Sequence, residues 1–137
     1  MLKIKKFNPR RLNILKDYLR ENVNPKQFDM FAVWEKNTET CGTAGCAMGW
    51  ACSIPSFKRA GLKLKSMNYF DIDDVEIYDI EFKDLGCFEA ASEFFTISKE
   101  EADYLFDPDS YPHTCKLTPK IVARRIENFI NKKLKAQ

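Results

Sequence analysis

The fold of this chain is constrained most by one stretch, residues 41–52, which reads CGTAGCAMGWAC. Thr43 is predicted to cap a helix, because its hydroxyl can accept a hydrogen bond from a backbone N–H one turn later. A glycine inside a helix costs roughly 0.5–1 kcal/mol relative to alanine, and this helix would hold two, Gly45 and Gly49, on one face. Close approach by neighbouring backbone can offset that cost. We therefore predict a short, fully buried central helix, Thr43–Cys52, against which the other elements pack.

The composition indicates one globular domain, residues 1–137. A chain of 137 residues is long enough to bury a real core. Hydrophobic residues make up 45%, including eleven phenylalanines, which excludes general disorder. The net charge of +2 and the isoelectric point of about 8.2 are too balanced to indicate a nucleic-acid binder.

The cysteine count and the hydropathy pattern bear on the cellular compartment. The five cysteines are an odd number, Met1–Phe7 is not an apolar signal segment, and no apolar run approaches a membrane span. Reduced, mostly buried thiols are typical of cytosolic proteins. We expect a cytoplasmic protein that does not contact a membrane.

Capping signals predict four helices besides the central one. They run from Pro9 to Asn22, from Leu85 to about Phe95 with Asp84 as cap, from the capping box at Ser98–Glu101 to Phe106, and from Thr118-Pro119 onward. The residues predicted to be buried in them recur at helical spacing: Leu12, Leu15 and Leu19, then Phe88, Ala91 and Phe95, then Ala102, Leu105 and Phe106, and finally Ile121, Val122, Ile126, Phe129 and Ile130. A further helical turn at Ser56–Ala60 would end at Gly61.

Strands are predicted where apolar residues alternate with period two. Leu62–Lys65 and Val75–Phe82 show this alternation and predict an antiparallel hairpin. A lone hairpin is marginal in water, so its apolar face should lie on the helices. Glu35–Thr40 is polar and is predicted to be a loop, while Asp29 could cap a helical turn. The predicted fold is α+β and mainly α: a compact four- to five-helix domain around a buried small-residue helix, with a small acidic β-hairpin.

Several short motifs resemble a family of small uncharacterised proteins from bacteria and phages. They are Phe28-Asp29-Met30 with Trp34, Cys41–Ala44, Gly49–Ala51, Thr118-Pro119, Val122-Ala123 and Arg125-Ile126. The resemblance covers most of the chain except the acidic middle, which looks like an insertion. It implies one compact cytosolic domain and a phage or prophage origin, which favours a counter-defence or host-interaction role. It implies no activity.

An enzymatic hypothesis makes Cys41 a nucleophile. A thiol at a helix N-terminus has a lowered pKa and is more nucleophilic. His113, the only histidine, would be the general base, oriented by Asp107 or Asp109. The backbone N–H groups of Gly42 and Thr43 could form an oxyanion hole. The alternative interpretation is that Cys41 packs under the Trp34 segment and His113 is solvated.

Two binding sites are predicted beside this thiol and in the acidic middle. Trp34 and Trp50 could line a pocket for a small anionic ligand next to Cys41, Gly42 and Thr43, although an aromatic cluster also suits a core. The acidic residues that could meet a basic protein partner are Asp71, Asp73, Asp74, Glu76, Asp79 and Glu81. A solvated face is the other explanation for these charges.

Metal and nucleic-acid sites are not predicted. Cysteines 41, 46 and 52 with His113 and Cys115 match no zinc-ligand spacing, so neither a metal nor another cofactor is expected. Lys120, Arg124 and Lys132 can form a basic stripe, but no recognition signature accompanies it. The predicted function is a binding protein that engages a protein partner or a small anionic ligand, and the alternative is a cysteine hydrolase.

Overall fold

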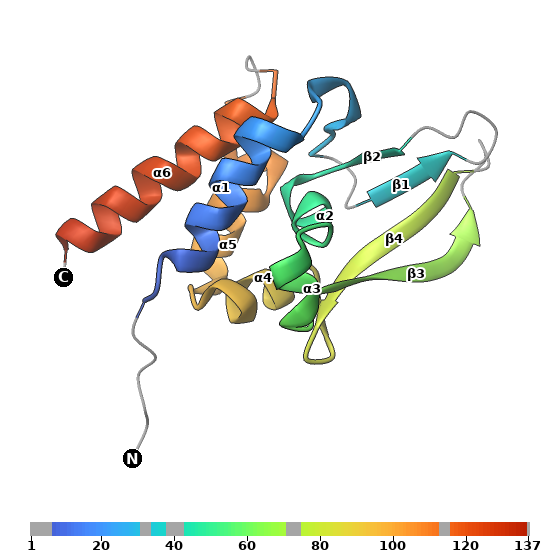
Figure 1. Ribbon diagram of the computed structural model, residues 1–137, viewed down its shortest axis with the longest axis horizontal. Coiled ribbons are helices and arrows are strands. Elements are labelled where there is room, and N and C mark those ends of the chain that lie inside the picture. Colours follow the sequence, from blue (N-terminus) through green and yellow to red (C-terminus); the bar gives the residue numbers. More distant parts are fainter. Residues whose placement is uncertain (1–6, 31–33, 38–42, 71–74, 113–115, 137) are drawn as a thin grey trace.

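The computed structural model describes residues 7–30, 34–37, 43–70, 75–112 and 116–136. The α-helices in this part of the chain are α1 (Arg10–Asn22), α2 (Ala47–Ala51), α3 (Pro55–Arg59), α4 (Cys87–Phe95), α5 (Lys99–Phe106) and α6 (Pro119–Lys135). The strands are β1 (Trp34–Asn37), β2 (Thr43–Gly45), β3 (Lys63–Phe70), β4 (Val75–Phe82) and β5 (Leu85–Gly86), and short 3-10 turns lie at η1 (Pro25–Gln27) and η2 (Pro108–Ser110). The fold is α+β and mainly helical, with the helices on one side of the molecule and the sheet on the other (Figure 1).

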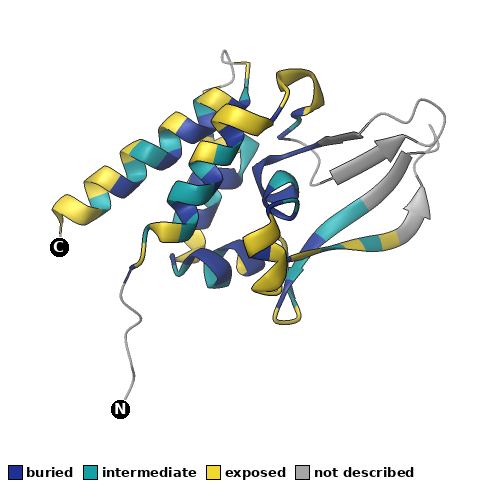
Figure 2. Ribbon diagram, viewed as in Figure 1, coloured by how far each residue is buried: buried dark blue, intermediate teal, exposed yellow. Residues whose placement is uncertain are grey.

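Helices α1 and α6 lie side by side and build one half of the core (Figure 1). Leu12, Leu15 and Leu19 are fully buried on α1, as their spacing predicts. Helix α6 buries Val122, Ala123, Ile126 and Ile130 and leaves the predicted Ile121 and Phe129 half-buried against the same core. Figure 2 shows buried and exposed segments alternating along both helices. The burial of each apolar stripe explains why these two helices form.

The predicted caps of α5 and α6 are confirmed. Ser98 Oγ accepts from the N–H of Glu101 at 3.0 Å, and Glu101 Oε1 accepts from the N–H of Ser98 at 2.8 Å. Thr118 Oγ1 accepts from the N–H of Ile121 at 3.2 Å, with Pro119 in the first turn of α6. Each cap satisfies backbone donors that the helix itself leaves without a partner.

The predicted hairpin is confirmed and belongs to a larger antiparallel sheet. Strand β4 pairs with β3, so that Lys63 lies opposite Glu81 and Leu64 opposite Ile80. The strand order is β2-β1-β4-β3, and β5 adds a short pair to the end of β4. Ile80 and Phe82 are buried, and β4 contacts α4. The apolar face of the hairpin therefore lies on a helix, as expected.

The prediction of a loop at Glu35–Thr40 is wrong over its first part. Strand β1 covers Trp34–Asn37 and pairs with β4 on one side and β2 on the other. Its residues, WEKN, carry no alternating apolar pattern. Two neighbouring strands supply the backbone partners that make this polar segment a strand, and that information is not local.

The predicted central helix is shorter than expected, because its first part is a strand. Thr43 is not an N-cap: Thr43–Gly45 forms β2, and Gly45 O accepts from the N–H of Asp29 at 2.9 Å. Helix α2 begins only at Ala47, with Cys46 in the cap position. Gly45 and Gly49 therefore do not share a helical face. Burial of the stretch is confirmed, since all residues from Gly45 to Cys52 except Trp50 are buried, and α2 lies between α1 and β4 (Figure 1).

Asp84 does not cap a helix. Lys83 and Asp84 have positive φ angles of 51° and 64° and form the turn between β4 and β5. Helix α4 then begins at Cys87 after Gly86. Its buried face holds Ala91 and Phe95 as predicted, but it buries Phe94 in place of Phe88, which stays half-buried.

An aromatic cluster joins α3 to the sheet and to α4. The ring of Phe94 lies 4.8 Å from that of Phe57 and 5.0 Å from that of Phe82. Phe95 stacks on Phe106 of α5 at 5.6 Å. Such ring pairs contribute about 0.5–1.5 kcal/mol each beyond the area they bury. The cluster holds α3 and the end of α4 close to the start of α1, and the site described below lies where these three elements meet.

Candidate functional site

The predicted catalytic pair cannot be compared with the structure. Cys41, Gly42 and His113 lie outside the described residues, so the thiol-enzyme hypothesis stays a prediction. Its proposed orienting carboxylate has another contact: Asp107 Oδ1 accepts from the N–H of Asp109 at 2.9 Å and caps η2.

The predicted ligand pocket is described in part. Trp34 and Thr43 lie on adjacent strands, where Trp34 pairs with Gly45 and Lys36 pairs with Thr43. Trp50 is half-buried on α2, and its Nε1 donates to Gln27 O at 3.1 Å. This contact fastens η1 to α2. Trp50 thus has a structural role whether or not a ligand binds beside it.

The acidic hairpin is partly neutralised at its base. Glu81 pairs with Lys63 at 3.2 Å and with Lys65 at 3.4 Å, and the hydrogen bond from Lys63 is the main cause that lowers the pKa of Glu81. Asp79 Oδ1 accepts from the N–H of Ile80 at 2.8 Å. Glu76 lies in β4 opposite Lys36 of β1. Asp71, Asp73 and Asp74 lie outside the described residues, so the predicted partner surface remains a prediction there.

The thiols in the described part of the chain are free, and two of them are buried. Cys46 and Cys52 flank α2, where burial raises the pKa of Cys46 to about 11 and that of Cys52 to about 12. Cys87 is exposed at the start of α4, and partial burial raises its pKa as well. Because their pKa values are raised, these thiols are weak nucleophiles at neutral pH.

No three His, Cys, Asp or Glu side chains within the described segments are grouped so as to hold a metal ion.

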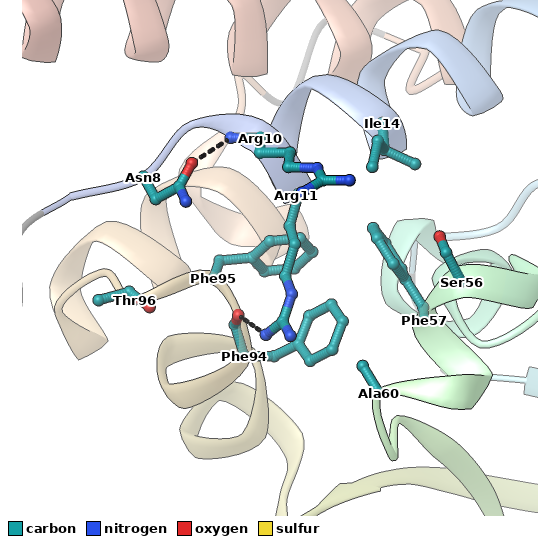
Figure 3. Close-up of a pocket in the computed structure, with 10 residues that line it drawn as sticks. All are labelled: Asn8, Arg10, Arg11, Ile14, Ser56, Phe57, Ala60, Phe94, Phe95 and Thr96. Carbon is teal, nitrogen blue, oxygen red and sulfur yellow. Dashed lines mark hydrogen bonds between the residues drawn. The ribbon is translucent and has the colours of Figure 1, made fainter.

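A pocket that the sequence did not predict lies where the start of α1, α3 and the end of α4 meet (Figure 3). Its volume is about 350 Å³. Ten residues line it: two are arginines, three are small polar residues, five are apolar and none is acidic. The lining therefore carries a formal charge of +2 from Arg10 and Arg11.

Arg11 forms part of the pocket wall in a fixed orientation. Its guanidinium carbon lies 4.1 Å from the centre of the Phe94 ring, and its Nη1 donates to Phe94 O at 2.8 Å. The ring beneath is fully buried, so the guanidinium covers the core as well as facing the pocket (Figure 3). A guanidinium has five N–H donors, so four remain for other acceptors.

Arg10 supplies the second charge from the first residue of α1. Its backbone N–H donates to Asn8 Oδ1 at 2.9 Å, which holds the start of the helix (Figure 3). Its guanidinium is exposed and forms no hydrogen bond or ion pair with any residue of the described segments. All its donors can therefore contact an anion in the pocket.

Arg10 is exposed and lies outside the apolar stripe of Leu12, Leu15 and Leu19, but the sequence did not predict the pocket. The signal present in the sequence is Asn8-Pro9 followed by two arginines. The other walls come from Ser56 and Ala60 on α3 and from Thr96 after α4. The walls come from three segments that lie more than thirty positions apart along the chain, and no local sequence pattern predicts that they meet.

Comparisons with known proteins do not assign the chain to a family. The chain matches no protein-family model, no curated protein and no solved structure. The resemblance to small bacterial and phage proteins accordingly stays an expectation. None of the helices in the described segments has the length and apolar character needed to cross a membrane.

Proposed function

We propose that this protein binds a small anionic ligand in the pocket between α1, α3 and α4. One observation carries the proposal: two guanidinium groups and no carboxylate line the same recess of about 350 Å³. Pockets for organic ligands typically enclose about 300–1,000 Å³. The arrangement favours an anion over a neutral or cationic ligand.

The electrostatics of the pocket support an anion. Acidic residues elsewhere pair with nearby cations, as Glu81 does with Lys63 and Glu127 with Arg20. Arg10 has no such partner in the described part of the chain. Charge-assisted hydrogen bonds to guanidinium groups are about twice as strong as neutral ones. A bound anion would provide the counter-charge that the protein itself does not.

The test is titration of the full chain with a panel of small anions, with binding followed by calorimetry and by NMR shifts of the backbone amides. We expect saturable binding with the largest shifts at the start of α1 and at Thr96. Arg10→Gln should weaken it about tenfold, the loss expected for one charged contact. Arg59→Gln is the matched control, because Arg59 is an exposed arginine of α3 that does not line the pocket. Equal affinity in both variants, or no saturable binding, would contradict the proposal.

As a second candidate we propose that the acidic hairpin engages a basic protein partner in the cytoplasm. What favours it is that the β3–β4 hairpin extends away from the helices (Figure 1). A phage or prophage origin with a counter-defence role is supported by the sequence resemblance alone. Replacing Asp71, Asp73 and Asp74 by Asn should abolish capture of the partner from host lysate, whereas Glu89→Gln with Glu100→Gln should not. Unchanged capture by the hairpin variant would rule this candidate out.

A further inference from the structure

We infer that the ligand of the α1–α3–α4 pocket is a small organic phosphate monoester, whose dianionic phosphoryl group lies between Arg10 and Arg11. The inference rests on the proposed function and assigns its substrate class. Charge, donor geometry and volume support it in turn.

The charge of the lining favours a dianion. Arg10 and Arg11 contribute +2, and no acidic residue lines the pocket. A carboxylate or a sulfate ester carries one negative charge and would leave one guanidinium uncompensated. A phosphate monoester carries about −1.5 to −2 at pH 7, because its second pKa is about 6. Of these three ligand types, only the phosphate monoester brings the occupied pocket to neutrality.

The donors of the lining also suit three terminal oxygens better than two. Arg11 donates one N–H to Phe94 O at 2.8 Å, which leaves four further N–H donors on its guanidinium. In Figure 3, Ser56 and Thr96 lie on either side of Arg11, and Arg10 and Asn8 lie above it. Polar residues on several sides of Arg11 suit the three terminal oxygens of a tetrahedral group better than the two coplanar oxygens of a carboxylate.

The volume indicates that the ligand is more than inorganic phosphate. The recess of about 350 Å³ exceeds what a single phosphoryl group fills, since one water occupies about 30 Å³ in the liquid. The rest of the wall includes the apolar side chains of Ile14 and Ala60. An organic group of a few carbon atoms can lie there while the phosphoryl oxygens contact the arginines.

The test compares three probes that share one ring: phenyl phosphate, phenyl sulfate and benzoate. Each is titrated calorimetrically into the full chain at pH 7.5 and at pH 5. We expect phenyl phosphate to bind at least about tenfold more tightly than the other two at pH 7.5. Its affinity should fall about tenfold at pH 5, because a second pKa of about 6 leaves roughly a tenth of it dianionic there. The other two probes are singly charged throughout most of this range and report any titration of the protein itself.

Arg10→Gln should remove the preference for phosphate over sulfate, and Arg59→Gln should keep it. Equal affinities for the three probes would overturn the inference while leaving the anion-binding function intact. No binding of any anion would overturn both. A phosphoserine peptide serves as a further arm: if it binds more than about tenfold tighter than phenyl phosphate, the partner is a phosphoprotein and the small-molecule assignment is wrong.

Discussion

Arg11 joins two helices through a single side chain. From α1 it reaches over the ring of Phe94 on α4 at 4.1 Å and donates to the carbonyl of the same residue at 2.8 Å. Because Phe94 also packs against Phe57 and Phe82, this contact fastens α1 to the aromatic cluster. Arg10, its neighbour, is exposed and lacks such a contact within the described residues. Arg11 thus contributes to stability as well as to the pocket wall, whereas Arg10 contributes to the pocket wall alone.

Substitution separates these contributions. Arg11→Gln should lower the free energy of unfolding by about 1–2 kcal/mol, since it removes a charged hydrogen bond and a cation–π contact. Arg10→Gln should change it by less than about 0.5 kcal/mol, as surface substitutions usually do. Urea denaturation followed by circular dichroism measures both. Equal losses in the two variants would show that Arg11 does not connect α1 to α4 in this way.

Thiol labelling distinguishes the described cysteines from the candidate nucleophile. Burial raises the pKa of Cys46 to about 11 and that of Cys52 to about 12, so neither should react with iodoacetamide until the protein unfolds. Cys87 is exposed and should react slowly, faster as the pH rises. The hydrolase hypothesis requires Cys41 to react well below pH 8. Peptide mass spectrometry across pH 6–10 assigns each rate, and absence of early Cys41 labelling would remove that hypothesis.

At the scale of elements, what could be predicted from the sequence was local. The start of α5 is encoded by Ser98 and Glu101, and the β3–β4 hairpin by alternation within each strand. Strands β1 and β2 could not be predicted, because the mostly polar Trp34–Asn37 and the small residues at Thr43–Gly45 become strands only through pairing with each other and with β4. The pocket could not be predicted from the sequence for the same reason. Its walls come from α1, α3 and α4, which meet through the buried ring cluster.

The capping box of α5 offers a direct test at this scale. Ser98→Ala removes the acceptor for the N–H of Glu101, and loss of an N-cap costs about 0.5–2 kcal/mol. We expect about 1 kcal/mol by chemical denaturation. Ser98→Asp is the rescue variant, because aspartate also caps well and should restore most of the stability. A loss that aspartate does not restore would indicate that Ser98 acts through something other than its cap.

In the whole molecule, ion pairs join elements that are distant along the chain. Glu127 of α6 pairs with Arg20 of α1 at 2.8 Å, and Glu101 of α5 pairs with Lys133 of α6 at 2.6 Å. The ammonium of Lys133 also lies 5.2 Å from the ring centre of Phe7. The second pair is less exposed than the first, so solvent screens it less. Through these two contacts, Lys133 holds α5, α6 and the start of the described chain together.

This arrangement predicts how stability depends on pH. Partial burial of Glu101 opposes ionisation, but the hydrogen bonds from Lys133 and Ser98 outweigh it and lower the pKa of the carboxyl. A lowered pKa in the folded state means that the pair stabilises the protein fully above the unfolded value of about 4.3. That stabilisation is lost as the pH falls through the lower folded value.

The variant Glu101→Gln tests this linkage, because glutamine can keep the capping box while it removes the charge. At pH 7 the variant should be less stable than the wild type, and the difference should shrink as the pH falls below about 4. Glu100→Gln, which removes an exposed carboxylate from the same turn, should show a smaller difference. Urea unfolding at intervals between pH 3 and pH 7 measures both. A difference between wild type and Glu101→Gln that stays constant across this range would mean that the charge of Glu101 does not stabilise the fold through Lys133.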